Sequence, residues 1–172
     1  MMMIWFCIYE NILSEVSWRK GIKWMNAAQR IQFSYQYNKG DTWASGAIEL
    51  DDRRFEFLCS CLFNNPLEVL LYSIYQLIPN LAPVPRKEIH FTLYDEPLEY
   101  SWYFKMLDNE TVGILIYSNG QNSVFEGRCN LIHLVKTFVQ SLPDQVVLTM
   151  DEKVRSIYEE LRHFIKRLSS HV

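Results

Sequence analysis

The amino-acid sequence predicts an α+β fold in which an antiparallel sheet of about six strands packs against helices, in the order β-β-β-α-β-β-β-α-α. Two observations lead to this fold class. Runs with a two-residue apolar period occur in two groups of three, and each group is followed by segments with a helical period. Strands that are grouped in this way, rather than alternating singly with helices, are typical of an antiparallel sheet covered on one face.

The first group of strands begins with the clearest alternation in the chain, over residues 30–37. Turn residues at 38–41 lead into a second strand over 43–50, which a glycine at position 46 is expected to weaken. After a turn at 51–52, a third strand follows. The residues expected on the shared inner faces are Ile31, Phe33, Tyr35 and Tyr37 in the first strand and Phe55, Phe57, Cys59 and Cys61 in the third.

Helix signals follow each group of strands. Asn64-Asn65-Pro66 predicts a helix start, and apolar residues then repeat at helical spacing as far as Pro79. After three strands over about 89–94, 99–106 and 112–117, Asn130 is expected to cap a helix that ends at Pro143. Thr149 and Glu152 predict a capping box for an amphipathic last helix.

Residues 25–172 are predicted to form one α+β domain, and residues 1–24 an N-terminal extension whose place in the natural domain the sequence leaves open. Met25 would itself serve as a start just before the first strand. The chain opens with about nine apolar residues, far fewer than the ~20 that cross a bilayer. This run has no basic segment before it and no small-residue cleavage site after it. We therefore expect a cytoplasmic protein with no membrane contact.

The composition favours a protein partner over a nucleic acid. The formal net charge is −3, and such a balance repels a phosphate backbone. Mild acidity suits a basic protein instead. Four scattered cysteines do not form a disulfide framework, which fits a reducing compartment.

The motifs of common enzyme classes are missing from the sequence. It contains no Gly-x-Ser-x-Gly elbow and no glycine-rich phosphate loop. The four histidines (His90, His133, His163 and His171) have no i,i+4 pairing and no nearby ligand at metal spacing. We therefore predict no catalytic residues, no metal and no cofactor, and a protein that is not an enzyme.

The stretch 95–102 is the one local cluster of reactive side chains. It reads Asp95-Glu96-Pro97-Leu98-Glu99-Tyr100-Ser101-Trp102, a hairpin apex with three carboxylates followed by alternating aromatics. Three interpretations stay open: solvated turn residues, an acidic edge that binds a partner, and a carboxylate pair for general acid/base work.

A larger acidic rim is expected if the turns gather at one end of the sheet. Carboxylates at the first turns would then join those of the hairpin, and aromatic side chains would supply the anchors of a protein interface. The alternative for each aromatic is a place in the core. The predicted partner-binding residues are Asp95, Glu96, Glu99, Asp41, Asp51, Asp52, Trp43, Tyr94 and Tyr103.

Three stretches carry a resemblance to a known group of proteins: Trp43-Ala44-Ser45-Gly46, Asn65-Pro66-Leu67, and the Glu-Pro-x-Glu-Tyr-x-Trp run within 95–102. Over about residues 29–142 the chain resembles small bacterial α+β proteins, some of which are immunity proteins of polymorphic toxin or contact-dependent growth inhibition systems. The resemblance implies a non-enzymatic protein that binds and neutralises a cognate toxin domain in the cytosol. The alternative is a non-catalytic structural or regulatory binding subunit, for which a homodimer stays open.

Overall fold

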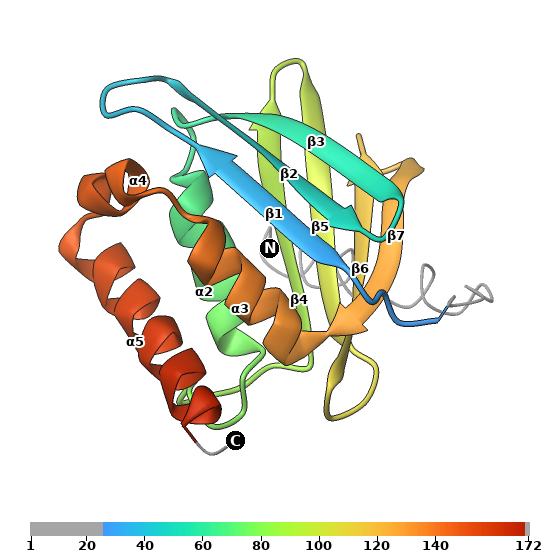
Figure 1. Ribbon diagram of the computed structural model, residues 1–172. Helices are drawn as coiled ribbons and strands as arrows, with labels where there is room; N and C mark the ends of the chain where they lie inside the picture. Colours follow the sequence, from blue (N-terminus) through green and yellow to red (C-terminus); the bar gives the residue numbers. More distant parts are fainter. Residues whose placement is uncertain (1–25, 171–172) are drawn as a thin grey trace, which may run out of the picture.

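The computed structural model describes residues 26–170, which form two antiparallel sheets and four helices (Figure 1). The three-stranded sheet has the order β1 (Ile31–Gln36), β2 (Trp43–Leu50) and β3 (Arg53–Ser60). The four-stranded sheet has the order β4 (Glu88–Asp95), β5 (Leu98–Met106), β6 (Thr111–Ser118) and β7 (Asn122–Asn130). The helices are α2 (Pro66–Gln76), α3 (Leu131–Ser141), α4 (Asp144–Thr149) and α5 (Glu152–Ser169).

The α+β class and the antiparallel pairing are confirmed, whereas the single sheet of about six strands is wrong. Helix α2 separates the strands into two sheets, and β7 adds a seventh strand. Only Phe125 and Cys129 of β7 are buried, and the pairing of β6 with β7 is irregular at Ile116/Tyr117. A strand with so few apolar residues has too weak an alternation to be recognised from sequence.

The core lies between the two sheets and three of the helices. Phe57 of β3 meets Trp102 of β5 edge to face, with ring centroids 5.5 Å apart. Helix α3 packs on β1, α2 packs on β4, and α5 packs on both helices. Figure 1 shows these helices together on one side of the sheets. This arrangement leaves the β4–β5 hairpin free at one end of the molecule.

The helix caps show which of the helix starts predicted from local sequence are correct. The Asn65 side chain accepts from the amides of Leu67 and Glu68, as predicted, and Asn130 caps α3 in the same way. The predicted capping box at Thr149 is wrong. Thr149 is the last residue of α4, and Asp151 caps α5 by accepting from the Val154 amide at 2.9 Å.

Gly46 lies within β2 at a position where the packing leaves no room for a side chain. A Cβ atom at this position would lie 2.4 Å from Cζ of Phe57 and 2.5 Å from the Ser34 carbonyl oxygen. The ring of Phe57 therefore packs directly over the backbone of β2, in the space that a side chain would fill.

Replacing Gly46 with alanine is expected to lower the free energy of unfolding by about 1–3 kcal/mol, because the added methyl group would clash with both the Phe57 ring and the β1 backbone. Urea denaturation followed by circular dichroism measures the change. Ser45→Ala, one residue away in β2, is the matched control and should cost less than about 0.5 kcal/mol. Equal stability of the two variants would contradict the close packing of Phe57 on β2.

Several expectations concern residues outside the described range. The apolar start, the extension over 1–24, Cys7 and His171 all lie there. Within residues 26–170, no helix has both the length and the apolar character needed to cross a bilayer.

Candidate functional site

A hollow of about 620 Å³ lies between the β4–β5 hairpin and the loop that precedes α2. It combines aromatic, apolar and acidic side chains. Its lining residues are Phe63, Asn64, Tyr94, Glu96, Pro97, Leu98 and Glu99.

Local sequence explains how the hollow forms. Asp95 pairs with Leu98, so only Glu96 and Pro97 connect β4 to β5, and this short connection keeps the two strands in register. On the other side, the Asn64 side chain donates from Nδ2 to the Thr92 carbonyl oxygen at 3.3 Å. This hydrogen bond ties the loop to the edge of β4.

Apolar side chains are exposed at the hollow. Of the lining residues, Phe63 is 62% exposed and Leu98 is 38% exposed. Leu62, which precedes Phe63 in the same loop, is 68% exposed. The Phe63 ring contacts the Tyr94 ring with centroids 5.3 Å apart at an interplanar angle of 53°. Large apolar groups that are held in contact with water, beside carboxylates, are typical of a protein interface.

The structure brings only part of the predicted acidic cluster to this hollow. Tyr94 and Glu99 are cross-strand partners and share one face, and Glu96 lies in the connection beside them. Asp95 points to the opposite face, because side chains alternate along a strand. Burial raises the pKa of Asp95 above its ordinary value, and the negative charge of Asp95 acts on the thiol of Cys59.

The carboxylates of the first turns do not gather into one rim. Asp41 and Trp43 lie where β2 begins, whereas Asp51 and Asp52 follow its end. A strand of eight residues spans roughly 25 Å. The single acidic rim is therefore not formed.

Asp51 has a structural role. Its Oδ1 accepts hydrogen bonds from the backbone amides of Gln29 and Arg30, at 3.0 and 2.9 Å. These bonds fix the segment that leads into β1. Asp52, next to it, is exposed.

Tyr103 lies on the same face of β5 as Glu99 but four residues along the strand, roughly 13 Å away. Its ring stacks on His90, with centroids 4.4 Å apart, and meets Tyr117 edge to face at 5.8 Å. Tyr103 therefore belongs to a separate aromatic cluster on the outer face of the four-stranded sheet.

Phe63, Leu62, Asn64 and Leu98 were not predicted as site residues. The sequence does contain one signal, because Leu62 and Phe63 are two large apolar residues placed between a strand and a helix cap. Apolar residues in a connecting loop either pack inward or mark a binding surface. The exposure of both side chains favours the second.

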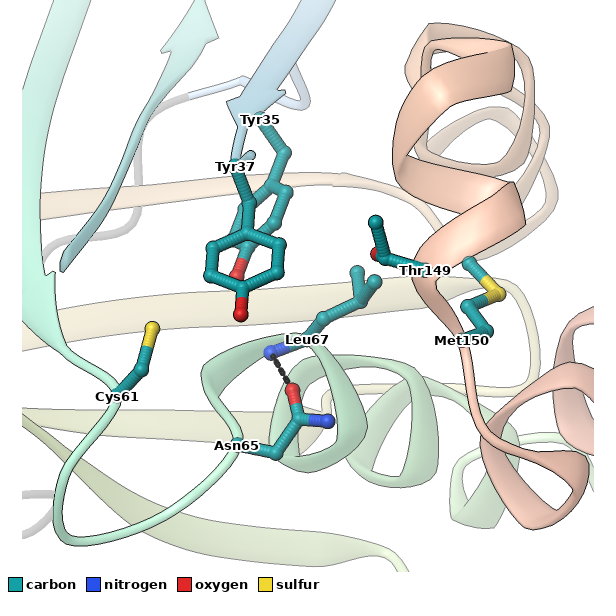
Figure 2. A pocket seen from close by; sticks show the side chains of 7 residues that line it. All are labelled: Tyr35, Tyr37, Cys61, Asn65, Leu67, Thr149 and Met150. Atoms are coloured by element: carbon teal, nitrogen blue, oxygen red, sulfur yellow. Dashed lines mark hydrogen bonds between the residues drawn. The ribbon is translucent and has the colours of Figure 1, made fainter. Parts of the chain in front are cut away.

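A smaller pocket of about 160 Å³ opens at the start of α2 (Figure 2). Figure 2 shows the phenol hydroxyls of Tyr35 and Tyr37 extending side by side into it, with the Cys61 thiol across from them. Its lining residues are Tyr35, Tyr37, Cys61, Asn65, Leu67, Thr149 and Met150.

The groups in this pocket are poor bases at neutral pH. None of its lining side chains is a carboxylate, an imidazole or an amine. Burial, assisted by the neighbouring Cys59 and Cys61, raises the pKa of the Tyr35 phenol, so this hydroxyl stays neutral. The pocket offers neutral hydrogen-bond donors to water or to a small polar molecule, and no nucleophile activated by a base.

Metal chemistry has no visible centre in the described part of the chain. No group of three or more His, Cys, Asp or Glu side chains in residues 26–170 is placed to hold an ion.

Comparison with known proteins finds no match: no family, no curated protein and no solved structure is detectably similar to the chain.

Proposed function

We propose that the protein is a non-catalytic immunity protein that binds and neutralises a cognate toxin domain in the bacterial cytoplasm. The observation that supports this proposal is an exposed apolar and acidic surface at the β4–β5 hairpin. We call it the hairpin surface and define it by Leu62, Phe63, Tyr94, Glu96, Leu98 and Glu99.

The two kinds of side chain have different roles in such an interface. Phe63, Tyr94 and Leu62 offer area that becomes dry on binding, and buried aromatic anchors supply most of the affinity of protein interfaces. Glu96 and Glu99 are exposed and lie around them. Carboxylates at the rim speed the encounter with a basic partner more than they tighten the final complex.

The residues that carry the resemblance to immunity proteins lie partly at the surface and partly in the core. In the Glu-Pro-x-Glu-Tyr-x-Trp run, the two glutamates and the proline lie at the hollow, whereas the side chain of Trp102 is buried in the core. The run therefore joins a fold-specifying tryptophan to an exposed hairpin. We assign the recognition of the toxin to the hairpin.

The decisive experiment is growth rescue. The experiment requires a toxin domain encoded by a gene next to that of this protein, and this domain is expressed in a susceptible host with and without the full chain. Rescue is expected with the wild-type chain and is expected to be lost with Phe63→Asp. Asp52→Lys, at the far end of β2, is a matched surface control that should still rescue. A chain that never rescues, or that rescues equally well with Phe63→Asp, contradicts the proposal.

The charge contribution is tested by association kinetics with that toxin domain. Glu96→Gln/Glu99→Gln is expected to reduce the association rate about fivefold at low salt, with little change in the dissociation rate. The reduction should shrink as salt is added, because surface charges are screened. Asp52→Asn/Glu56→Gln removes the same charge elsewhere and should leave the rate unchanged. An unchanged rate for the Glu96/Glu99 variant would remove these carboxylates from the interface.

A second candidate function is a structural or regulatory binding subunit. It is favoured by an open groove of about 740 Å³ between α2 and α5, in which Tyr72 is 49% exposed and stacks on Tyr75. If this groove forms a homodimer, the mass measured by light scattering should double with concentration and return to the monomer value for Tyr72→Glu.

A further inference from the structure

The hairpin surface brings aromatic rings, carboxylates and an amide side chain together around a single hollow. Phe63 and Tyr94 provide two aromatic rings whose centroids lie 5.3 Å apart. Glu96 and Glu99 provide two carboxylates, and none of the lining residues is basic. Asn64 also lines the hollow, and its Oδ1 is buried without a hydrogen-bond partner.

We propose that this hollow binds an arginine side chain of the partner protein, with the guanidinium group against the Phe63 and Tyr94 rings and its N–H groups directed to the carboxylates. The inference rests on the proposed function, since it takes the partner to be a basic protein, and it adds the residue type that the site recognises.

The ring pair favours guanidinium over ammonium. Guanidinium is planar and weakly hydrated, so it can stack on an aromatic ring while its edge still donates hydrogen bonds. A lysine ammonium is compact and strongly hydrated, and it loses more hydration on entering an aromatic hollow. The carboxylates add to this preference, because the planar fork of guanidinium can donate two parallel hydrogen bonds to a carboxylate.

The carboxylates are available to such a ligand. Within residues 26–170, neither Glu96 nor Glu99 forms an ion pair with a lysine or an arginine of the chain. The backbone amide of Glu99 donates to Asn119 Oδ1 at 3.0 Å, which fixes the start of β5 without using the Glu99 side chain.

The donor count of guanidinium also suits this site. Guanidinium carries five N–H donors in a planar fork, so it can donate to both carboxylates at once.

The test uses three small probes on the full chain labelled with ¹⁵N: the N-acetyl N-methylamides of arginine, lysine and citrulline. Citrulline has nearly the shape of arginine but is neutral. The arginine probe is expected to give saturable amide shifts, in the millimolar range, at Phe63, Asn64, Tyr94 and Glu99. The lysine probe should bind about two- to fivefold more weakly, and the citrulline probe should cause no saturable shift.

Two variants separate the contribution of the carboxylates from that of the Phe63 ring. Glu96→Gln/Glu99→Gln is expected to weaken the arginine probe about fivefold. Phe63→Leu keeps the apolar bulk but removes one of the two rings, so it should reduce the preference for arginine over lysine. Spectra of both variants should match the wild type away from the hairpin, which shows that they fold. Equal binding of arginine and citrulline, shifts at other residues, or an arginine preference that Phe63→Leu leaves undiminished would each overturn the proposal.

The outcome is independent of growth rescue. If the toxin is neutralised through the hairpin surface but the arginine probe does not bind there, the arginine inference fails and the immunity function stands. If the arginine probe binds as described but no toxin is neutralised, the site is correct and the immunity function fails.

Discussion

Replacing Trp102 with alanine is expected to lower the free energy of unfolding by about 3–5 kcal/mol. The side chain is only 1% exposed and lies where the two sheets meet. Its ring packs against Phe55 and Phe57 of the three-stranded sheet, at centroid distances of 5.8 and 5.5 Å, and against Phe91 in β4 at 5.7 Å. Alanine removes all of these contacts and leaves a cavity that rings on both sides cannot fill. Urea denaturation at neutral pH measures the loss.

Trp102→Phe is the matched control. The indole Nε1 is buried and has no hydrogen-bond partner, so phenylalanine removes an unpaired donor while it keeps an aromatic ring. The loss should therefore be less than half that of Trp102→Ala. A loss below about 1.5 kcal/mol for Trp102→Ala would mean that Trp102 does not hold the two sheets together.

Strong alternation is what made most of the sheets predictable. In β1, the buried Phe33 and Tyr35 alternate with exposed polar residues, so period and burial agree along the whole strand. β7 offers only Phe125 and Cys129 as buried apolar residues, and apart from the exposed Val124 the rest of the strand is polar or glycine. Its place depends on pairing with β6, which is a property of the folded chain and not of the segment.

The caps show the same division between local and distant causes. Asn65 next to Pro66 specifies a helix start within a few residues, and the structure has it there. Thr149 has an equally good local pattern, but Val146 is buried and the segment from Asp144 folds as α4. Thr149 then ends that helix, and Asp151 becomes the cap of the next.

The candidate site was half predictable. The turn chemistry at Glu96 and Pro97 indicated a hairpin, and the structure exposes Glu96 and Glu99 at its tip. The opposite orientation of Asp95 follows from the alternation of side chains along β4, which a grouping of the carboxylates by their nearness in sequence does not take into account. Phe63 was missed because exposure of a loop side chain depends on what packs beside it, here Tyr94.

Raising the pH from 8 to 10 is expected to destabilise the protein by about 3 kcal/mol through two buried thiols. Cys59 and Cys129 are fully buried, and burial raises the pKa of each from 9.0 to about 12. Below pH 9 both thiols are neutral in the folded and the unfolded chain, and their contribution is complete. Between pH 9 and 12 the unfolded chain releases these protons and the folded chain retains them, so stability falls as the pH rises. At pH 10 the loss is about 1.4 kcal/mol for each thiol.

The double variant Cys59→Ala/Cys129→Ala isolates this contribution from the lysines and tyrosines that titrate in the same range. Its stability at pH 8 changes because two core side chains shrink, so the informative quantity is the slope between pH 8 and 10. This slope should be smaller than that of the wild type by about 3 kcal/mol over the interval. Burial also raises the pKa of Tyr35, so part of the alkaline loss should persist in the variant and diminish in Tyr35→Phe. Parallel stability curves for the wild type and the double variant would show that Cys59 and Cys129 ionise as easily in the folded chain as in water, which their burial between the sheets does not permit.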